Sequence, residues 1–158
     1  MRYGSKLGAA RRGQSMVEMA ISLWVFLFIG FGLVEGALWA WHNGTLQHAV
    51  EEGARYALRS KQEDGVTPMD EATVKAAVIA TGYGLGLTAP DVTVVVCPDG
   101  TACDPLCASG PAYATRVMGD RIRVCAQYTH TMLLGSLVFG QSSVVIPRQA
   151  QIRVESTP

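Results

Sequence analysis

The chain has 158 residues, enough for one small domain, and its 13 Lys and Arg residues balance 13 Asp and Glu residues. The zero net charge hides an uneven distribution, because the first twelve residues contain Arg2, Lys6, Arg11 and Arg12 and no acidic residue. The remaining basic residues are scattered among acidic ones and are not interleaved with aromatic residues. This pattern argues against nucleic acid as a partner.

An apolar segment follows this basic leader. Residues 19–34 carry no charge, and with their neighbours up to Trp41 they reach the length of a membrane-spanning helix. Glu18 and Glu35 bracket the segment at a distance of about 25 Å along a helix, close to the thickness of a bilayer's hydrocarbon core. Basic residues beside a span stay on the cytoplasmic side. We therefore expect a cytoplasmic leader at 1–13, a transmembrane helix at 14–41 and an extracytoplasmic head at 42–158.

The helical pattern continues beyond the apolar segment. Leu46, Val50, Gly53 and Ala57 share one stripe at helical spacing, which predicts one long helix to about Arg59 whose second half is amphipathic. A second, short helix is expected from about Pro68 to Thr81, with Thr67 as N-cap, Pro68 in the first turn and Asp70 as the capping-box acid. Gly82, Gly84 and Gly86 follow its end.

Three later segments have the composition of β-strands: 92–97, 121–129 and 149–155. In the second and third, apolar and polar residues alternate, as in a sheet with one buried and one wet face. The long helix can cover the buried face. The fold class is therefore α+β, with a long N-terminal helix packed on a small antiparallel sheet of about three strands, plus one short helix.

All four cysteines lie in the segment expected outside the membrane, where disulfides form. They lack the paired spacing of a zinc site, and His42, His48 and His130 are far apart in sequence and expected to be solvated, so we predict no metal site and no cofactor. Three pairings are possible. Because Cys97 and Cys125 fall on the polar faces of adjacent predicted strands, we favour that pair, which leaves Cys103 with Cys107.

The inner boundary of the apolar segment carries the most informative motif, RRGQSMVE, from Arg11 to Glu18. A carboxylate at the edge of the hydrocarbon is costly unless it has a partner. If the chain were cut after Gly13, Gln14 would become the first residue, and its new amino group would lie one helical turn from Glu18. The simpler alternative is an uncut signal anchor in which Glu18 lies at the headgroup level.

Glycine, four residues, glutamate and a hydrophobic run resembles the cleavage signature of type IV prepilins. The sequence from Val17 to Arg59, with its second V-E pair and EGARYA, closely resembles the TadE-like family, the pseudopilins of the tight-adherence (Tad/Flp) pilus, and residues 124–155 are similar to that family's C-terminal half. One position departs from the pattern: Met19 follows the glutamate, where pilins of this system usually have tyrosine or phenylalanine.

The resemblance implies a minor pseudopilin that acts in assembly or priming of the pilus. Its implied partners are a prepilin peptidase that cuts between Gly13 and Gln14, other pilin and pseudopilin subunits, the inner-membrane platform of the system and membrane lipid. Glu18 would take the family's fifth-position role in assembly. The implied location is the bacterial inner membrane with a periplasmic head, and the pilus after assembly.

A second hypothesis is a permanently anchored binding module whose disulfide-stapled loop, between Cys97 and Cys125, recognises an extracellular partner. An enzyme is not expected. The sequence contains no nucleophile elbow, phosphate-binding loop or His-rich zinc helix, and the acidic residues outside the membrane are not clustered.

Overall fold

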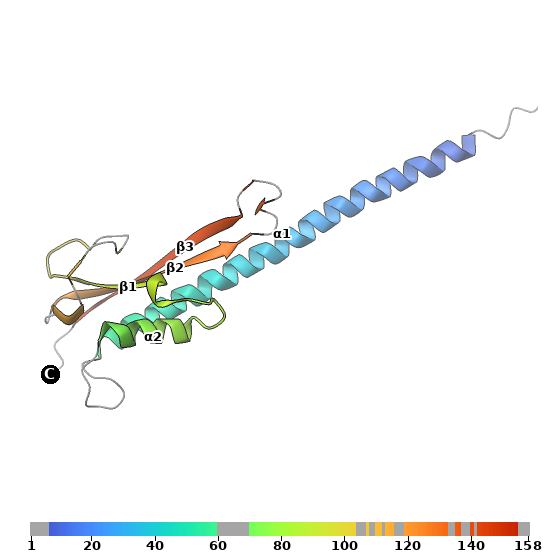
Figure 1. Cartoon of the computed structure of the whole chain (residues 1–158). Helices are drawn as coiled ribbons and strands as arrows, with labels where there is room; N and C mark the ends of the chain where they lie inside the picture. Colours follow the sequence, from blue (N-terminus) through green and yellow to red (C-terminus); the bar gives the residue numbers. More distant parts are fainter. Residues whose placement is uncertain are drawn as a thin grey trace, which may run out of the picture.

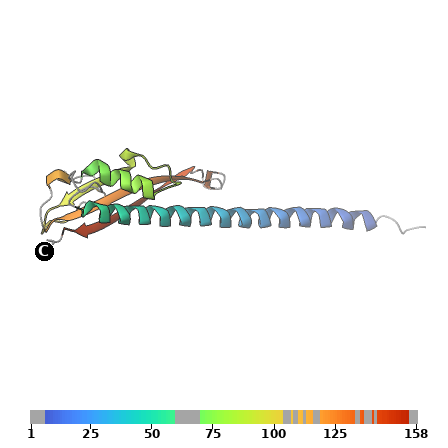
Figure 2. The ribbon, with the colours of Figure 1, turned by 90° about the horizontal axis from the view of Figure 1, so that it is seen from below.

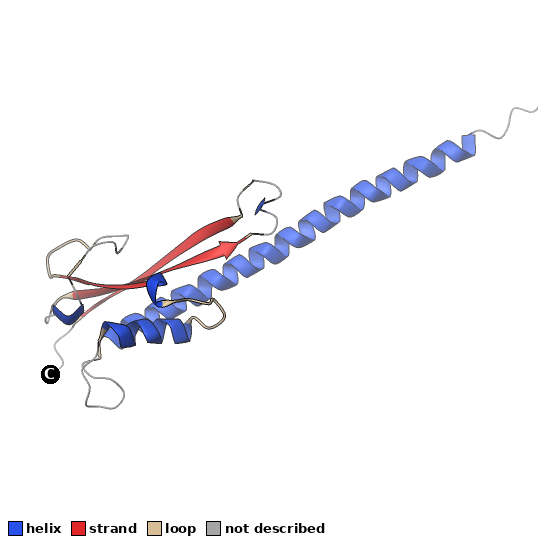
Figure 3. Cartoon of the chain, in the orientation of Figure 1, coloured by secondary structure: helices blue, strands red, loops and turns tan. Residues whose placement is uncertain are grey.

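The computed structural model describes the backbone of residues 7–59, 70–103, 107, 110–111, 113–115, 119–132, 135–136, 140 and 142–154, with side chains from residue 14 onward. Its elements in chain order are α1 (Leu7–Ala57), α2 (Glu71–Thr81), the 3-10 turn η1 (Ala89–Asp91), β1 (Val92–Cys97), the 3-10 turn η2 (Tyr113–Thr115), β2 (Arg121–Thr131) and β3 (Ser143–Arg153). Figures 1 and 3 show a long helix with a small head gathered along one half of it. The predicted α+β class is confirmed.

Helix α1 is one continuous element of 51 residues that contains no proline. It passes without a break through both expected boundaries, after Gly13 and after Trp41, so the division into leader, span and head remains a prediction from the sequence. Figure 2 shows the first half of α1 extending as a rod beyond the head. This one apolar helix is long enough to cross a membrane and is compatible with single-pass anchoring.

The sheet has the order β1-β2-β3, and both pairings are antiparallel. Val94 lies opposite Val124, and Val124 lies opposite Ala150 on the other side, so the even-numbered residues of all three strands share one face. This face packs against α1 and α2 and forms the main core. The predicted alternation in the second strand is confirmed by buried Ile122, Val124 and Ala126.

The second half of α1 supplies the other side of the core. Leu46, Val50, Gly53 and Ala57, the predicted stripe, are all buried, and Arg55 points outward and pairs with Glu52 at 3.9 Å. Gly53 is the point of closest approach, because a Cβ atom there would lie only 2.2 Å from Cγ2 of Val78 in α2. The stripe thus contacts the short helix as well as the sheet.

The start of the short helix differs from the prediction. Helix α2 begins at Glu71, and Asp70 is its N-cap: Oδ1 of Asp70 accepts a hydrogen bond of 2.8 Å from the backbone N–H of Thr73. The prediction that the helix begins near Pro68, with Asp70 inside it as the capping-box acid, is therefore wrong. An aspartate can serve in either position, and only the backbone conformation decides between them. Thr67 and Pro68 lie outside the described residues.

The third strand is longer than predicted. β3 begins at Ser143, before Pro147, and the prediction began after this proline. Proline interrupts most strands because it lacks an N–H donor. β3 is an edge strand, where one side of the backbone needs no partner, and Pro147 is accommodated opposite Gln127.

Replacing Gly53 with alanine tests the close contact between α1 and α2. The added methyl group overlaps Val78, and overpacking of this kind costs about 1–3 kcal/mol in unfolding free energy. Gly44→Ala is the matched control, because a Cβ atom at Gly44 has nothing within 4 Å and gains only helix propensity of about 0.5–1 kcal/mol. Denaturant unfolding of the full chain in detergent should find G53A less stable than G44A. Equal stabilities would contradict this packing.

Candidate functional site

The inner end of the apolar helix brings together two of the predicted processing and assembly residues. Nε2 of Gln14 donates a hydrogen bond of 3.1 Å to Oε1 of Glu18, one helical turn away. Ser22 Oγ donates to the backbone carbonyl of Glu18 at 2.8 Å. The geometry thus places the first and fifth residues of the predicted mature chain within direct reach of each other.

Before any cleavage, the partner of Glu18 is a neutral amide. The backbone nitrogen of Gln14 is then part of the peptide bond to Gly13, and that bond lies within α1. A cut after Gly13 would turn this nitrogen into a charged amine on the same helical turn as the carboxylate. A charge pair between this amine and the Glu18 carboxylate would then link residues of the same helical turn.

The surface beyond Glu18 is apolar and uncovered. The large hydrophobic side chains between Met16 and Val34 are between 41% and 77% exposed, and no residue of the most apolar window of the helix is buried by the described part of the chain. Burying such a side chain is worth about 1.5–3 kcal/mol. Leaving the whole set in water would outweigh the stability of a small domain, so this surface requires lipid or other apolar helices.

The glycines of this segment are equally open. A Cβ atom at Gly30, Gly32 or Gly36 would meet nothing within 4 Å. Gly32 and Gly36 lie on one face of α1 at a spacing that permits close approach of a second helix. Glu35 is half-buried, unlike the exposed residues on either side of it. Figures 1 and 2 show the β2–β3 end of the head extending along α1 toward this apolar half.

The four cysteines form two disulfides, as predicted, but with a different pairing. Cys97 is bonded to Cys103 and Cys107 to Cys125, with Cα–Cα distances of 5.4 and 6.3 Å. The favoured pair of Cys97 with Cys125 is wrong because of strand register: Cys125 lies opposite Thr93, whereas Cys97 lies opposite Arg121. Four residues along a strand span about 13 Å, beyond the reach of a disulfide.

This pairing fastens the loop after β1 to the outer face of the sheet. Cys107 and Cys125 are buried together with Val95, as a second small cluster. Gly110 lies so close to this cluster that a Cβ atom there would be 3.0 Å from Cβ of Val95. The outer face, expected to be wet, is therefore partly covered. On the other side, the hydroxyl of Tyr113 in η2 donates to the carbonyl of Ala57 at the end of α1, at 2.7 Å.

Two of the three histidines meet, contrary to the expectation that all are separate and solvated. Nδ1 of His42 on α1 and Nδ1 of His130 on β2 are 3.0 Å apart, and His130 is buried. The ring of Tyr128 also lies 5.0 Å from that of His42. A hydrogen bond between these nitrogens needs one N–H and one bare nitrogen. Residues 88 positions apart in sequence gave no local signal for this contact.

Burial shifts the pKa of His42. Desolvation, followed by the influence of His130, lowers the pKa of His42 below its ordinary value. Among the described residues there is no group of three or more His, Cys, Asp or Glu side chains arranged to hold a metal ion. The pair is best described as a partly buried link between α1 and β2, near the outer end of the predicted span.

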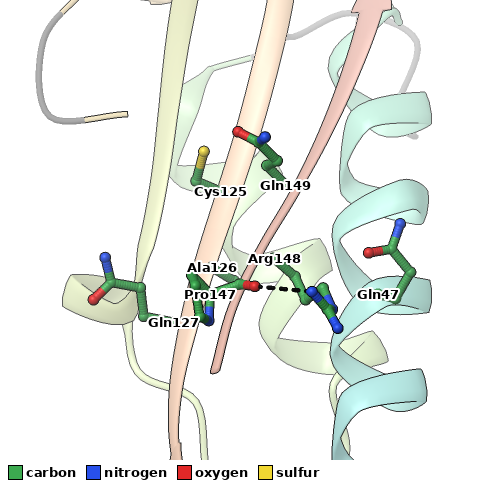
Figure 4. Close-up of a pocket in the computed structure, with 7 residues that line it drawn as sticks. All are labelled: Gln47, Cys125, Ala126, Gln127, Pro147, Arg148 and Gln149. Atoms are coloured by element: carbon green, nitrogen blue, oxygen red, sulfur yellow. Dashed lines mark hydrogen bonds between the residues drawn. The ribbon is translucent and has the colours of Figure 1, made fainter. Parts of the chain in front are cut away.

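Figure 4 shows a shallow pocket between α1 and the β2–β3 strands. The only charged side chain that lines it is that of Arg148, whose Nη1 donates to the carbonyl of Pro147 at 3.4 Å. The other lining residues are Gln47, Cys125, Ala126, Gln127, Pro147 and Gln149. This set offers amides and one guanidinium but no carboxylate or imidazole that could move a proton.

The His42 shift predicts how stability depends on pH. Because the folded state lowers the pKa of His42, the unfolded chain binds more protons between the folded pKa and about 6.5. The free energy of unfolding should therefore fall as pH is lowered through this window. Equilibrium unfolding at several pH values checks this, with His42→Gln expected to flatten the dependence. His48→Gln, at an exposed histidine of the same helix, should leave it unchanged; an identical effect of both changes would contradict the assignment.

The disulfide pairing can be tested by peptide mapping without reduction. Cleavage before Asp91, Asp99 and Asp104 and after arginine places each cysteine on its own peptide: 91–98, 99–103, 104–116 and 124–148. The structure predicts that 91–98 is linked to 99–103, and 104–116 to 124–148. A link between 91–98 and 124–148 would instead restore the pairing favoured from the sequence.

Comparison with known proteins finds a related family for one part of the chain. The family model described as TadE-like protein matches residues 13–55. The match begins at Gly13, includes Glu18 and the whole apolar segment, and ends within the amphipathic half of α1. It confirms the resemblance inferred from the sequence over these residues, and the similarity of residues 124–155 to the family's C-terminal half stays a prediction. The chain has no match among curated proteins or among solved structures.

Proposed function

We propose that this chain, whose residues 13–55 match the TadE-like family model, is a minor pseudopilin that acts in assembly or priming of a tight-adherence pilus. A prepilin peptidase cuts it after Gly13. The mature subunit is held in the inner membrane by the apolar half of α1, with the head in the periplasm, and later packs among other pilin and pseudopilin helices at the platform or in the filament.

The observation that carries this proposal is the exposed apolar half of α1, which is continuous with a helix that also forms the core of the head. A helix used only as an anchor does not need to share its backbone with the folded domain. Because α1 is rigidly part of the head, movement of this helix out of the bilayer and into a bundle would carry the head with it. Such a transfer is the step that a pilus subunit must make.

The position of Glu18 supports the same proposal. A carboxylate on an otherwise apolar, exposed helix surface costs free energy in lipid, and it is better accommodated when a positive charge is close. The 3.1 Å contact of the Gln14 side chain with Glu18 supports the idea that the new amine of Gln14 lies close to this carboxylate in the same chain. The amine of a neighbouring subunit can offer the same charge. Glu18 can therefore stabilise the cleaved chain by itself and also its association with other cleaved subunits.

The permanently anchored binding module is the competing proposal. Its support is the loop that two disulfides fasten over the outer face of the sheet. In that case the charge at Glu18 has no role beyond the membrane boundary. We further propose that the chain is not an enzyme, because neither the shallow pocket nor the His42–His130 pair supplies a nucleophile together with a base.

Substitution of Glu18 separates the two proposals. Glu18→Gln keeps a side chain that can accept a hydrogen bond from Gln14 but removes the charge, and Glu18→Ala removes both. If Glu18 acts in assembly, both variants should be expressed at normal levels in the membrane and should abolish piliation, as counted by electron microscopy. Met19→Phe, which changes the next residue without altering charge, is the matched control and should retain piliation. Normal piliation in E18A would favour the anchored module.

A further inference from the structure

The charged residues of this chain are absent from three separate segments. Residues 36–50, 76–90 and 124–147 contain no Asp, Glu, Lys or Arg, although these types make up 16% of the sequence. The three segments belong to the first turns of α1 beyond Glu35, the second half of α2 with its following loop, and most of the β2–β3 hairpin. Nothing in the sequence order brings them together.

The fold places all three at the end of the head that faces the predicted span. α2 runs antiparallel to α1, as three close contacts show. Val78 of α2 lies beside Gly53 of α1. A Cβ atom added at Gly82 would lie 3.6 Å from Cβ of Ala49, and one added at Gly84 would lie 3.3 Å from Cη2 of Trp41. His130 of β2 meets His42, the residue after Trp41. We call the described residues of these three segments from His42 onward the neutral collar.

The ion pairs of the described residues lie toward the other end of the head. Three ion pairs there are Arg55 with Glu52, Lys75 with Glu71, and Arg153 with Asp99. Figure 1 shows the C-terminal end of β3 and the start of α2 at the end of the head remote from the apolar half of α1. The described ion pairs therefore lie away from the span, and the charged residues Glu51, Asp91 and Arg148 border the neutral collar on its distal side.

The neutral collar also exposes apolar and aromatic side chains. Tyr83, in the loop after α2, is 87% exposed, and Val145 on β3 is 54% exposed. Tyr83 directly precedes Gly84, which touches Trp41, so it lies at the level of the aromatic residues that end the span. An open groove lined by Ala40, Trp41, Gly44, Thr45, His48 and Thr81 lies at the same level and has no Asp, Glu, Lys or Arg in its lining.

We propose that the neutral collar lies in the headgroup region of the bilayer that α1 spans, with Tyr83 inserted as an aromatic anchor beside Trp39 and Trp41. Tyrosine and tryptophan are favoured in this zone because their rings are apolar and their N–H or O–H groups reach water. Fixed charges are costly at the hydrocarbon boundary, and the collar has none. The phospholipid surface is the chosen occupant because the collar is continuous with the lipid-facing surface of α1.

This placement adds a second contact between the head and the membrane. A head joined to its span only through α1 could tilt freely, whereas insertion at Tyr83 and at the helix fixes its orientation relative to the bilayer. The inference rests on the membrane placement of α1, which the proposed function also requires. Its test therefore includes a separate reporter for the span.

The experiment uses the full chain in two sets of phosphatidylcholine vesicles, whose acyl chains are brominated either near the headgroup or near the middle of the bilayer. Trp24, Trp39 and Trp41 are replaced by phenylalanine, and single tryptophans are then introduced as Tyr83→Trp in the neutral collar or Leu58→Trp in the distal part. Leu58 is 40% exposed and lies just after the end of α1. A third protein keeps only Trp24, which is 75% exposed within the span. Val145→Trp is the second collar reporter if Tyr83→Trp does not fold.

The inference predicts that bromine quenches the tryptophan emission of the Trp24 protein and of Y83W but not that of L58W. It also predicts that Y83W emits at a shorter wavelength than L58W. Quenching of Trp24 without quenching of Y83W would overturn the inference and leave the proposed function intact. No quenching of Trp24 would overturn both. A blue shift of Y83W that grows with the protein-to-lipid ratio and is insensitive to bromine would assign the collar to contact between subunits instead of to lipid.

Discussion

The uncovered apolar surface of α1 is the constraint on which the rest of the structure depends. Its large side chains between Met16 and Val34 are at least 41% exposed, and their exposure to water would cost more than a head of this size can supply. The protein is therefore stable only with this half of the helix in lipid or among similar helices. Both environments are apolar, and this is why one surface can serve first as an anchor and then as an assembly element.

No loop separates the apolar half of α1 from the half that packs in the head; only the distribution of apolar side chains around the helix changes. Before Trp41 apolar side chains surround α1, and after it they are confined to the stripe that includes Leu46 and Val50. The sheet and α2 cover this stripe, and Gly53 permits their close approach. The contact of His42 with His130 and that of Tyr113 with Ala57 tie the head to the helix near both ends of the stripe. Helix and head therefore move as one body.

The parts of this fold that follow from local periodicity could be predicted from the sequence. The long helix, the first two strands and the buried stripe depend on spacings of two to four residues, and all are confirmed.

The start of α2 could not be predicted in this way, because Asp70 suits either of two positions in a helical cap. The length of β3 was missed because Pro147 is tolerated only on an edge strand, and the edge position depends on the order of strands in the sheet. The disulfide pairing depends on the register of Cys125 opposite Thr93, and the His42–His130 contact depends on packing of distant segments; neither leaves a local signal. Gln14 and Glu18 are only four residues apart, and their side chains are in contact, whereas the pairing of Glu18 with a new amine after cleavage stays a prediction.

The central claim is that the helix becomes an assembly element when the leader is removed, so the N-terminus of the protein in the membrane is the decisive quantity. Mass spectrometry of the intact protein, extracted from the membranes of cells with and without a prepilin peptidase, measures it directly. The account predicts a chain beginning at Gln14 in cells that contain the peptidase and at Met1 in cells that lack it. A chain that begins at Met1 in both would contradict the account and leave the protein as a permanent anchor.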